Sequence, residues 1–295
     1  MNVSEGRRAD VIERIALRIR ATAGVRLLDV SSDPSHHRTV FTMAGTAEGL
    51  FDAVLSLTDA AVAAIDLRLH RGVHPRLGAV DVIPFIPIGD TPMETAVALA
   101  RRVGQAIGER FGIPVFLYEE AATVPHRRAL EAIRRGEFET LAERMRDPQW
   151  APDFGPRAPH PTAGATVVGA RPFLIAYNVN LATADVAVAR WIAGRVRERD
   201  GGLPRVKALG LSLSDRLTQV SMNLTDYRVT GIRAAYDRVE REAAERGVRV
   251  LESELIGLAP AAALDAAIAK AVRLRDFSEE RILERRIEAM VDGQA

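Results

Sequence analysis

The chain repeats one order of hydrophobic segments on either side of a proline-rich stretch, and this order limits the folds it can adopt. Six prolines interrupt residues 148–172, and a stretch of this kind is typical of a linker, a lid or a binding loop. The second half then reads strand, helix, strand, strand, helix, strand, and the first half reads the same in outline. The halves share no clear sequence identity, so the repeat concerns topology alone.

Apolar periodicity predicts the individual elements. Helical spacing predicts helices over 9–22, 46–67, 91–112, 126–147, 183–200 and 231–247. Alternating or continuous apolar runs predict strands over 24–33, 37–45, 79–88, 113–121, 173–181, 205–213, 217–227 and 248–258. Thr46, Thr91 and Thr183 are the expected N-caps of three helices, the segment 126–147 is expected to be a charged, exposed helix, and Pro84 suggests an edge strand or an irregular strand end.

This order predicts an α+β fold of two units, in which helices cover one face of mainly antiparallel sheets. The glycine-rich loops that bind dinucleotides or nucleotide phosphates are absent from the sequence. Net charge is +1, which offers no basic footprint for nucleic acid. The chain has no cysteine, which excludes disulfides, thiolate nucleophiles and Cys-ligated zinc. Apolar runs stay well short of the ~20 residues that span a bilayer.

The stretch HRGVHPRLGAVDVIPFIP, residues 70–87, places titratable residues and chain-bending residues at the start of a buried strand. Pro75 biases His74 toward an extended backbone, and nearby glycines allow the chain to approach a ligand closely. Arg76 follows with a guanidinium suited to carboxylates. Local chemistry therefore makes His74 a candidate general acid/base, although a histidine that only completes a turn would look the same.

Other polar positions leave alternatives open. His70 and His74 have the spacing of a helical zinc pair, but Gly72 and Pro75 break any helix there, so we expect no metal site. His36 and His37 fit an ordinary polar turn. In residues 164–171, Gly164, Gly169 and Arg171 would expose backbone N–H groups and a charge to a ligand, or form a tight turn into a core strand. Polar residues at every second position of 219–225 fit either a solvated sheet face or the lining of a cleft.

Several stretches together resemble the glutamate formiminotransferase family. They are NVSEGR, LLDVSSDPSHHRTV, GVHPRLGAVDVIPFIP, VFLYEEAA, WAPDFGP, GATVVGAR, FLIAYNVNL, QVSMNLTDY and ELIGLAP. They occur in the family's order and cover nearly the whole chain, and HPRLGAVDV and WAPDFGP are the most specific of them. The cyclodeaminase half of animal members has no counterpart in this sequence.

The resemblance implies two ferredoxin-like subdomains, over 1–170 and 171–295, with a ligand cleft between them. It implies transfer of the formimino group from N-formimino-L-glutamate to N5 of tetrahydrofolate, a co-substrate, without a metal. His74 matches the histidine that acts as general acid/base. The folate-contacting segments fall on 155–164 and 202–210, which makes candidates of Gly155, Pro156, Gly164, Lys207 and Gly210.

The required chemistry fits the residues. One histidine that titrates near neutral pH can take the proton from N5 and return it to the departing glutamate amine. Both substrates carry carboxylates, so Arg38, Arg76 and Arg171 are expected anchors. Asp33 is the nearest candidate for a carboxylate that assists His74. We also expect a homodimer in the cytoplasm, with small-molecule substrates and no nucleic-acid or membrane partner.

Three departures from the family's pattern bear on the donor. The sequence starts inside the family's first strand, at MNVSEGR, so that strand is short or begins upstream. His37 stands where many members have asparagine, and Ser31, Ser32 and Asp33 stand where mammalian members place an acidic residue. Two alternatives therefore stay open: a related folate-dependent transferase with another donor, such as formylglutamate or formiminoglycine, and a folate-binding protein without turnover.

Overall fold

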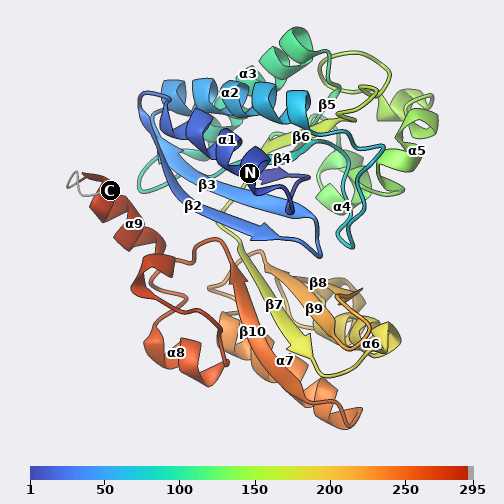
Figure 1. Cartoon of the computed structure of the whole chain (residues 1–295), viewed down its shortest axis with the longest axis vertical. Helices are drawn as coiled ribbons and strands as arrows, with labels where there is room; N and C mark the ends of the chain where they lie inside the picture. The colour runs from blue at the N-terminus through green and yellow to red at the C-terminus, as the bar shows by residue number, and fades with distance from the viewer. Residues whose placement is uncertain (292–295) are drawn as a thin grey trace. The chain divides into compact units, whose positions relative to one another are not determined.

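The computed structural model describes residues 1–291, which divide into two compact units, one over Met1–Arg171 and one that begins at Pro172. The predicted α+β class is confirmed, since each unit contains a sheet with helices packed on it (Figure 1). Within residues 1–291, no helix combines the length and the apolar character needed to cross a membrane.

The first unit is built on a six-stranded sheet in the order β2-β3-β1-β4-β6-β5 (Figure 1). Strands β1 to β4 are antiparallel and, with helices α1 and α2, follow the βαββαβ order of a ferredoxin-like unit. Strand β6 extends this sheet and pairs in parallel with both β4 and β5. The elements are β1 (Asn2–Val3), α1 (Ala9–Arg20), β2 (Val25–Asp33), β3 (Arg38–Gly45), α2 (Ala47–Ala64), β4 (Val80–Phe85), α3 (Met93–Phe111), β5 (Val115–Glu119), α4 (Leu130–Ile133), α5 (Glu137–Arg144) and β6 (Thr166–Ala170).

Local sequence explains where these helices begin and end. In α1, buried residues recur at helical spacing and form one apolar face, with Val11, Ile15 and Ile19 in the core. The Thr46 hydroxyl accepts a hydrogen bond from the Gly49 amide, so the expected N-cap of α2 is confirmed. Helix α3 ends at Gly112, whose φ of 62° places it in the left-handed region that glycine tolerates.

Strands β5 and β6 are buried on both faces, which explains their continuous apolar sequences. Val115 and Leu117 face the main core beneath α1, α2 and α3. Phe116 and Tyr118 face a second core, which α4 and α5 cover with side chains such as Ile133. Because successive side chains of a strand point to opposite faces, one strand can supply both cores.

The second unit has a four-stranded antiparallel sheet in the order β10-β7-β9-β8. Its first six elements repeat the βαββαβ order, as the sequence predicted. Helices α6 and α7 pack on the sheet around one core that contains Tyr177, Ile192 and Val239. The elements are β7 (Ile175–Leu181), α6 (Val186–Val196), β8 (Val206–Ser212), β9 (Thr218–Leu224), α7 (Ile232–Glu245), β10 (Val250–Ile256), α8 (Ala266–Ala271) and α9 (Leu283–Val291).

Strand β4 is not the edge strand that Pro84 suggested, because β1 and β6 pair with it on either side. The two-residue β1 explains how a proline is accommodated there. In the β1–β4 pairing, Asn2 lies opposite Val82 and Val3 opposite Val80, so Pro84 lies beyond the end of β1. The missing N–H of Pro84 therefore removes no hydrogen bond from the β1–β4 ladder.

Three helix predictions were wrong in detail. The segment 126–147 is not one exposed helix: Gly136, with a φ of 79°, separates α4 from α5, and Ile133 and Leu141 are fully buried. Helix α6 is capped by Asp185, whose carboxylate accepts from the Ala187 amide, rather than by Thr183. Helix α3 begins at Met93 with no side-chain cap, so the Thr91 prediction fails as well.

The WAPDFGP motif attaches the proline-rich stretch to β5. The carboxylate of Asp153 accepts hydrogen bonds from the Leu117 amide at 2.8 Å and from Arg127, while the backbone of Phe154 pairs with Val115. The Phe154 ring lies close to Gly104 in α3, where an added Cβ would be 3.1 Å from the ring. This motif therefore fixes a connection of the fold.

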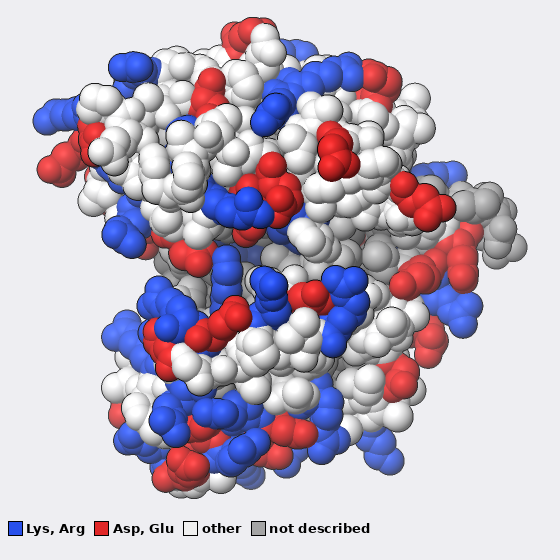
Figure 2. Space-filling model, turned by 180° about the vertical axis from the view of Figure 1, so that it is seen from behind, with Lys and Arg blue, Asp and Glu red and all other residues white. Residues whose placement is uncertain are grey.

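Basic and acidic side chains are interspersed over the face of the molecule seen in Figure 2. Some charged residues form ion pairs within one helix, such as Arg233 with Asp237 in α7. This mixture agrees with the net charge of +1.

Candidate active site

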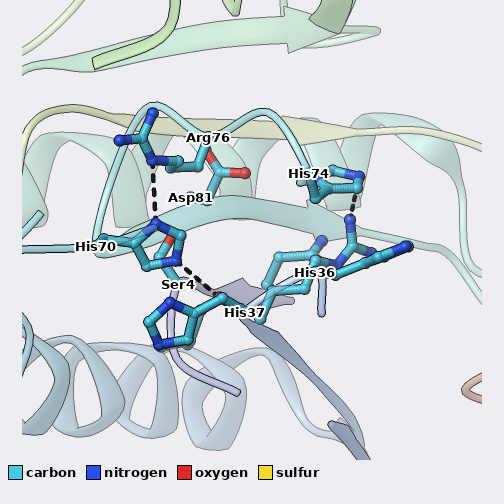
Figure 3. A pocket seen from close by; sticks show the side chains of 10 residues that line it. Ser4, His36, His37, His70, His74, Arg76 and Asp81 are labelled. Atoms are coloured by element: carbon cyan, nitrogen blue, oxygen red, sulfur yellow. Dashed lines mark hydrogen bonds between the residues drawn. The ribbon is translucent and has the colours of Figure 1, made fainter. Parts of the chain in front are cut away.

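A small pocket in the first unit brings together three segments that are distant in sequence (Figure 3). The pocket is lined by β1 and the residue after it, by the turn between β2 and β3 with the first residue of β3, and by the chain from His70 to the start of β4. The lining residues are Asn2, Val3, Ser4, His36, His37, Arg38, His70, His74, Arg76 and Asp81. Three predicted site residues, Arg38, His74 and Arg76, therefore lie at one pocket.

The turn and the loop pack directly on each other at Gly72. A Cβ added at Gly72 would lie 2.4 Å from the His36 carbonyl oxygen and 2.8 Å from the His37 Cβ. The Val73 amide also donates to the Ser35 carbonyl. Glycine at this position thus permits the close approach that brings His74 to the turn.

The two ring nitrogens of His74 have different partners. Nδ1 lies 2.8 Å from the Pro75 carbonyl oxygen, which can only accept, so Nδ1 carries the proton. Nε2 lies 2.5 Å from Nη1 of Arg38, which can only donate, so Nε2 presents its lone pair. Burial, followed by the charges of Arg38 and Arg134, lowers the pKa of His74 well below its usual 6.5. His74 is therefore a neutral imidazole with a defined tautomer at neutral pH.

Arg38 begins β3 and places its guanidinium beside His74. Burial lowers the pKa of Arg38 to about 10, which leaves it charged at neutral pH. Among residues 1–291, the hydrogen bond to His74 is the one that its side chain forms. Most of its five N–H donors are thus available to an anionic group.

His37 and His70 connect the turn to the loop. Their rings stack with centroids 4.1 Å apart. Nδ1 of His37 lies 3.0 Å from the Arg71 carbonyl oxygen, and Nε2 lies 3.2 Å from the Glu5 carboxylate. His37 also has a φ of 53°, a left-handed backbone that its contacts must hold in place.

His70 is a neutral connector in this cluster. Its Nε2 donates to the His37 carbonyl at 2.8 Å, and its Nδ1 accepts from Nε of Arg76 at 3.2 Å (Figure 3). Burial is the main cause that lowers the pKa of His70 to about 4. His70 therefore orders the loop, and His74 is the histidine with a reactive lone pair.

Arg76 is directed into the protein rather than toward open space. Its guanidinium donates to Glu137 at 2.8 Å and to both carboxylate oxygens of Glu139, besides the bond to His70. These carboxylates raise the pKa of Arg76 despite its partial burial. Few donors remain for a substrate, so Arg76 anchors the loop to α5.

Asp81 is a pocket residue that sequence reasoning missed. One oxygen of its buried carboxylate accepts from the Leu77 amide at 2.7 Å, and the other forms an ion pair with Arg134. Its negative charge raises the pKa of Arg38. The sequence did contain a signal for it, because Asp81 is the single charged residue in the apolar strand sequence AVDVIPF. A buried charge requires a compensating partner, so an aspartate in such a strand indicates a polar site nearby.

Asp33, the predicted assisting carboxylate, holds the turn. One of its oxygens accepts from the Ser35 amide at 2.7 Å and from the His36 amide at 2.8 Å. Asp33 also pairs with Arg38 across the β2–β3 ladder, and its charge raises the pKa of Arg38. It acts on the site through the turn and through Arg38.

The predicted glycines have different surroundings. Gly155 and Pro156 are exposed, and Gly155 has a φ of 82°. Gly164 is buried, and a Cβ there would lie 2.2 Å from the Leu77 carbonyl oxygen. Cβ atoms at Gly169 and Gly210 would lie 2.4 Å from Tyr118 and 2.2 Å from the Arg190 amide nitrogen. Gly169 thus permits β6 to pack on Tyr118, and Gly210 permits β8 to pack on α6.

Arg171 and Lys207 lie outside this pocket. The Arg171 amide donates to the Phe85 carbonyl at 3.0 Å, just after the end of β6. Lys207 is a half-buried residue of β8 in the second unit. Within residues 1–291, His, Asp and Glu side chains form no group of three or more able to hold a metal ion.

Comparison with known proteins identifies the family. The model of the formiminotransferase domain, N-terminal subdomain, matches residues 1–171, and the model of the formiminotransferase domain matches residues 176–290. A glutamate formimidoyltransferase of Thermoplasma acidophilum is 48% identical over 290 residues, which cover 97% of this chain and 95% of that protein.

Two further relatives agree. A glutamate formimidoyltransferase of Streptococcus pyogenes is 42% identical, with 96% of this chain and 95% of that protein covered. The formimidoyltransferase-cyclodeaminase of Rattus norvegicus is 43% identical over 269 residues, which cover 89% of this chain and 50% of the rat protein. With both family models matching along the chain, this protein belongs to the formiminotransferase family and is a transferase.

Proposed function

We propose that this protein transfers the formimino group from N-formimino-L-glutamate to N5 of tetrahydrofolate, giving 5-formiminotetrahydrofolate and glutamate. The observation that carries the proposal is the contact between His74 and Arg38 in the pocket, in a chain of this family. A neutral base whose lone pair faces the pocket and a cation with available donors are the two groups that this reaction needs.

His74 acts as general base and then as general acid. Its Nε2 takes the N5 proton as the bond between N5 and the formimino carbon forms. The resulting imidazolium returns this proton to the glutamate nitrogen as the bond between that nitrogen and the formimino carbon breaks. The hydrogen bond from Nδ1 to the Pro75 carbonyl keeps one proton on Nδ1, so Nε2 is the nitrogen that gains and then loses the transferred proton. Such proton transfers typically contribute ~10²–10⁴-fold to the rate.

Arg38 binds a carboxylate of the substrates. Its guanidinium turns from Nε2 of His74 to that carboxylate, which leaves the lone pair free for the N5 proton. Burial, together with this charge and that of Arg134, keeps His74 unprotonated before the reaction. Binding and proton transfer are therefore coupled through one hydrogen bond.

The remaining predicted residues support the site in two ways. Arg76, Asp33 and the buried glycines shape the pocket and the sheets around it, as their contacts indicate. The exposed loop with Gly155 and Pro156, together with Lys207, is proposed to contact folate, as the family resemblance implies. Arg171 is proposed to anchor a substrate carboxylate. The homodimer and the cytoplasmic location stay predictions from the sequence.

The experiment follows the absorbance of 5-formiminotetrahydrofolate with purified protein, tetrahydrofolate and formiminoglutamate. We expect turnover by the wild type and a fall in kcat of about 10²–10⁴-fold in His74→Ala. Folate binding, measured by calorimetry, should persist in this variant. Full activity of His74→Ala would refute the assigned role, and absence of turnover by the wild type would refute the proposed function.

A further inference from the structure

Asn2 has an unusual side chain in the pocket. Its amide oxygen is buried and accepts no hydrogen bond from the part of the chain that the structure describes, residues 1–291. Buried polar atoms nearly always have a partner, so an exception needs an explanation. Asn2 lines the same pocket as His74, which suggests that a bound ligand supplies the missing donor.

The sheet register places Asn2 next to the reactive pair. Asn2 of β1 pairs with Val40 of β3, and residues directly opposite in a sheet share a face. Arg38 lies two residues from Val40 and therefore on that same face. Because Arg38 donates to Nε2 of His74, the Asn2 amide belongs to the surface that a reacting group at His74 would meet.

We propose that Asn2 binds the nitrogen of the formimino group during transfer and so selects a formimino donor over a formyl donor. This inference rests on the proposed function. A formimino carbon carries a protonated nitrogen, whose N–H groups can donate to the Asn2 oxygen. A formyl carbon carries an oxygen instead, so two acceptors would face each other. Sites that hydrogen-bond a substrate N–H discriminate strongly against analogues that lack it.

Two substitutions separate this role from other roles of the amide. Asn2→Leu keeps the approximate size of the side chain and removes all hydrogen bonding. Asn2→Asp keeps oxygens that accept and removes the N–H₂ group, which could otherwise turn and donate to a formyl oxygen. If the amide acts as an acceptor, Asp should therefore replace it and Leu should not.

The experiment measures kcat/KM for formiminoglutamate and the inhibition constant of formylglutamate against it. In Asn2→Leu we expect kcat/KM to fall about 10- to 100-fold, with the formylglutamate constant changed less than about threefold. In Asn2→Asp we expect kcat/KM to stay within about tenfold of the wild type, with weaker inhibition by formylglutamate. The melting temperature of Asn2→Leu should equal or exceed that of the wild type, because the substitution removes a buried atom without a partner.

A residue with a merely structural role would give other results. The inference would be overturned if Asn2→Leu left kcat/KM for formiminoglutamate unchanged. It would also be overturned if this variant weakened formylglutamate inhibition by the same factor as it lowered kcat/KM, with or without a lower melting temperature. Equal losses of formiminoglutamate turnover in the Leu and Asp variants would also overturn it. Wild-type turnover with an unaffected Asn2→Leu refutes this inference alone, whereas a wild type without turnover refutes it together with the proposed function.

Discussion

At the scale of single residues, the state of His74 is set by what surrounds it. The Pro75 carbonyl fixes the proton on Nδ1, and Arg38 faces the lone pair on Nε2. Burial and two arginine charges oppose a second proton. His74 is thus kept in its basic form by its position, before any substrate binds.

This arrangement predicts the pH dependence of the reaction. Because the pKa of His74 lies well below 6.5, the base form dominates at neutral pH, and kcat/KM should stay level as the pH falls to 6.5. Activity should fall only at more acidic pH, when His74 becomes protonated. Removal of the neighbouring cation in Arg38→Gln should raise the pKa of His74 and move this acidic limb to higher pH.

The matched control is Arg68→Gln, which removes the same charge from an exposed residue paired with Asp66. It should leave the acidic limb of the kcat/KM profile where the wild type has it. A limb that stays in place in Arg38→Gln would show that Arg38 does not hold His74 in the neutral form.

At the scale of elements, WAPDFGP is a structural connection that is easily mistaken for a site. The carboxylate of Asp153 is buried with Arg127 and accepts the Leu117 amide of β5. These contacts hold the segment that precedes the exposed loop at Gly155. The residues of this motif are thus explained by the contacts that pack the proline-rich stretch against β5.

Asp153→Ala should therefore destabilise the protein by about 3–5 kcal/mol, the usual cost of leaving one partner of a buried ion pair alone. The free energy of unfolding from urea titration measures this. Asp147→Ala is the control, because Asp147 only caps the short turn at Gln149 and is exposed; its loss should cost about 1 kcal/mol. Equal effects of the two substitutions would contradict the role given to Asp153.

The sequence predicted elements well where periodicity extends over many residues. The helices near α1, α2 and α7 and most strands follow directly from their apolar spacing. Strand β1 was hard to assign because two residues show no period, and β6 was missed because its apolar sequence, TVVGA, lies within a proline- and glycine-rich stretch.

The site was partly predictable for a similar reason. His74 and Arg38 could be singled out because they lie in distinctive stretches of sequence. Arg76 pairs with Glu137 and Glu139, which lie more than sixty residues away along the chain. This pairing therefore depends on how α5 packs. Asn2 and Asp81 look like ordinary strand residues until the sheet register brings them to the pocket.

At the scale of the whole molecule, the hydrophobic cores of the two units share no residue. The two cores of the first unit draw only on residues up to Ala170, and the core of the second unit begins at Ile175. The sheets likewise share no strand. Each unit therefore has the internal contacts that a folding domain needs.

We expect fragments 1–171 and 172–295 to fold separately. Each should show the far-ultraviolet circular dichroism of its helices and strands and unfold cooperatively in urea. Fragment 1–171 with His74→Ala is a suitable comparison, since this substitution should leave its folding intact. A fragment that stays unfolded in the absence of urea would contradict the independence of the units.

The loop that carries His74 is held at two places: His70 binds the turn at His37, and Arg76 binds Glu137 of α5. Leu69, just before this loop, is 79% exposed. Because the chain contains no cysteine, Leu69→Cys would create a unique thiol for a fluorescent label. Such a label would lie beside the reactive loop without replacing any of its contacts. The same features that hold His74 in place thus make its loop suitable for spectroscopy during turnover.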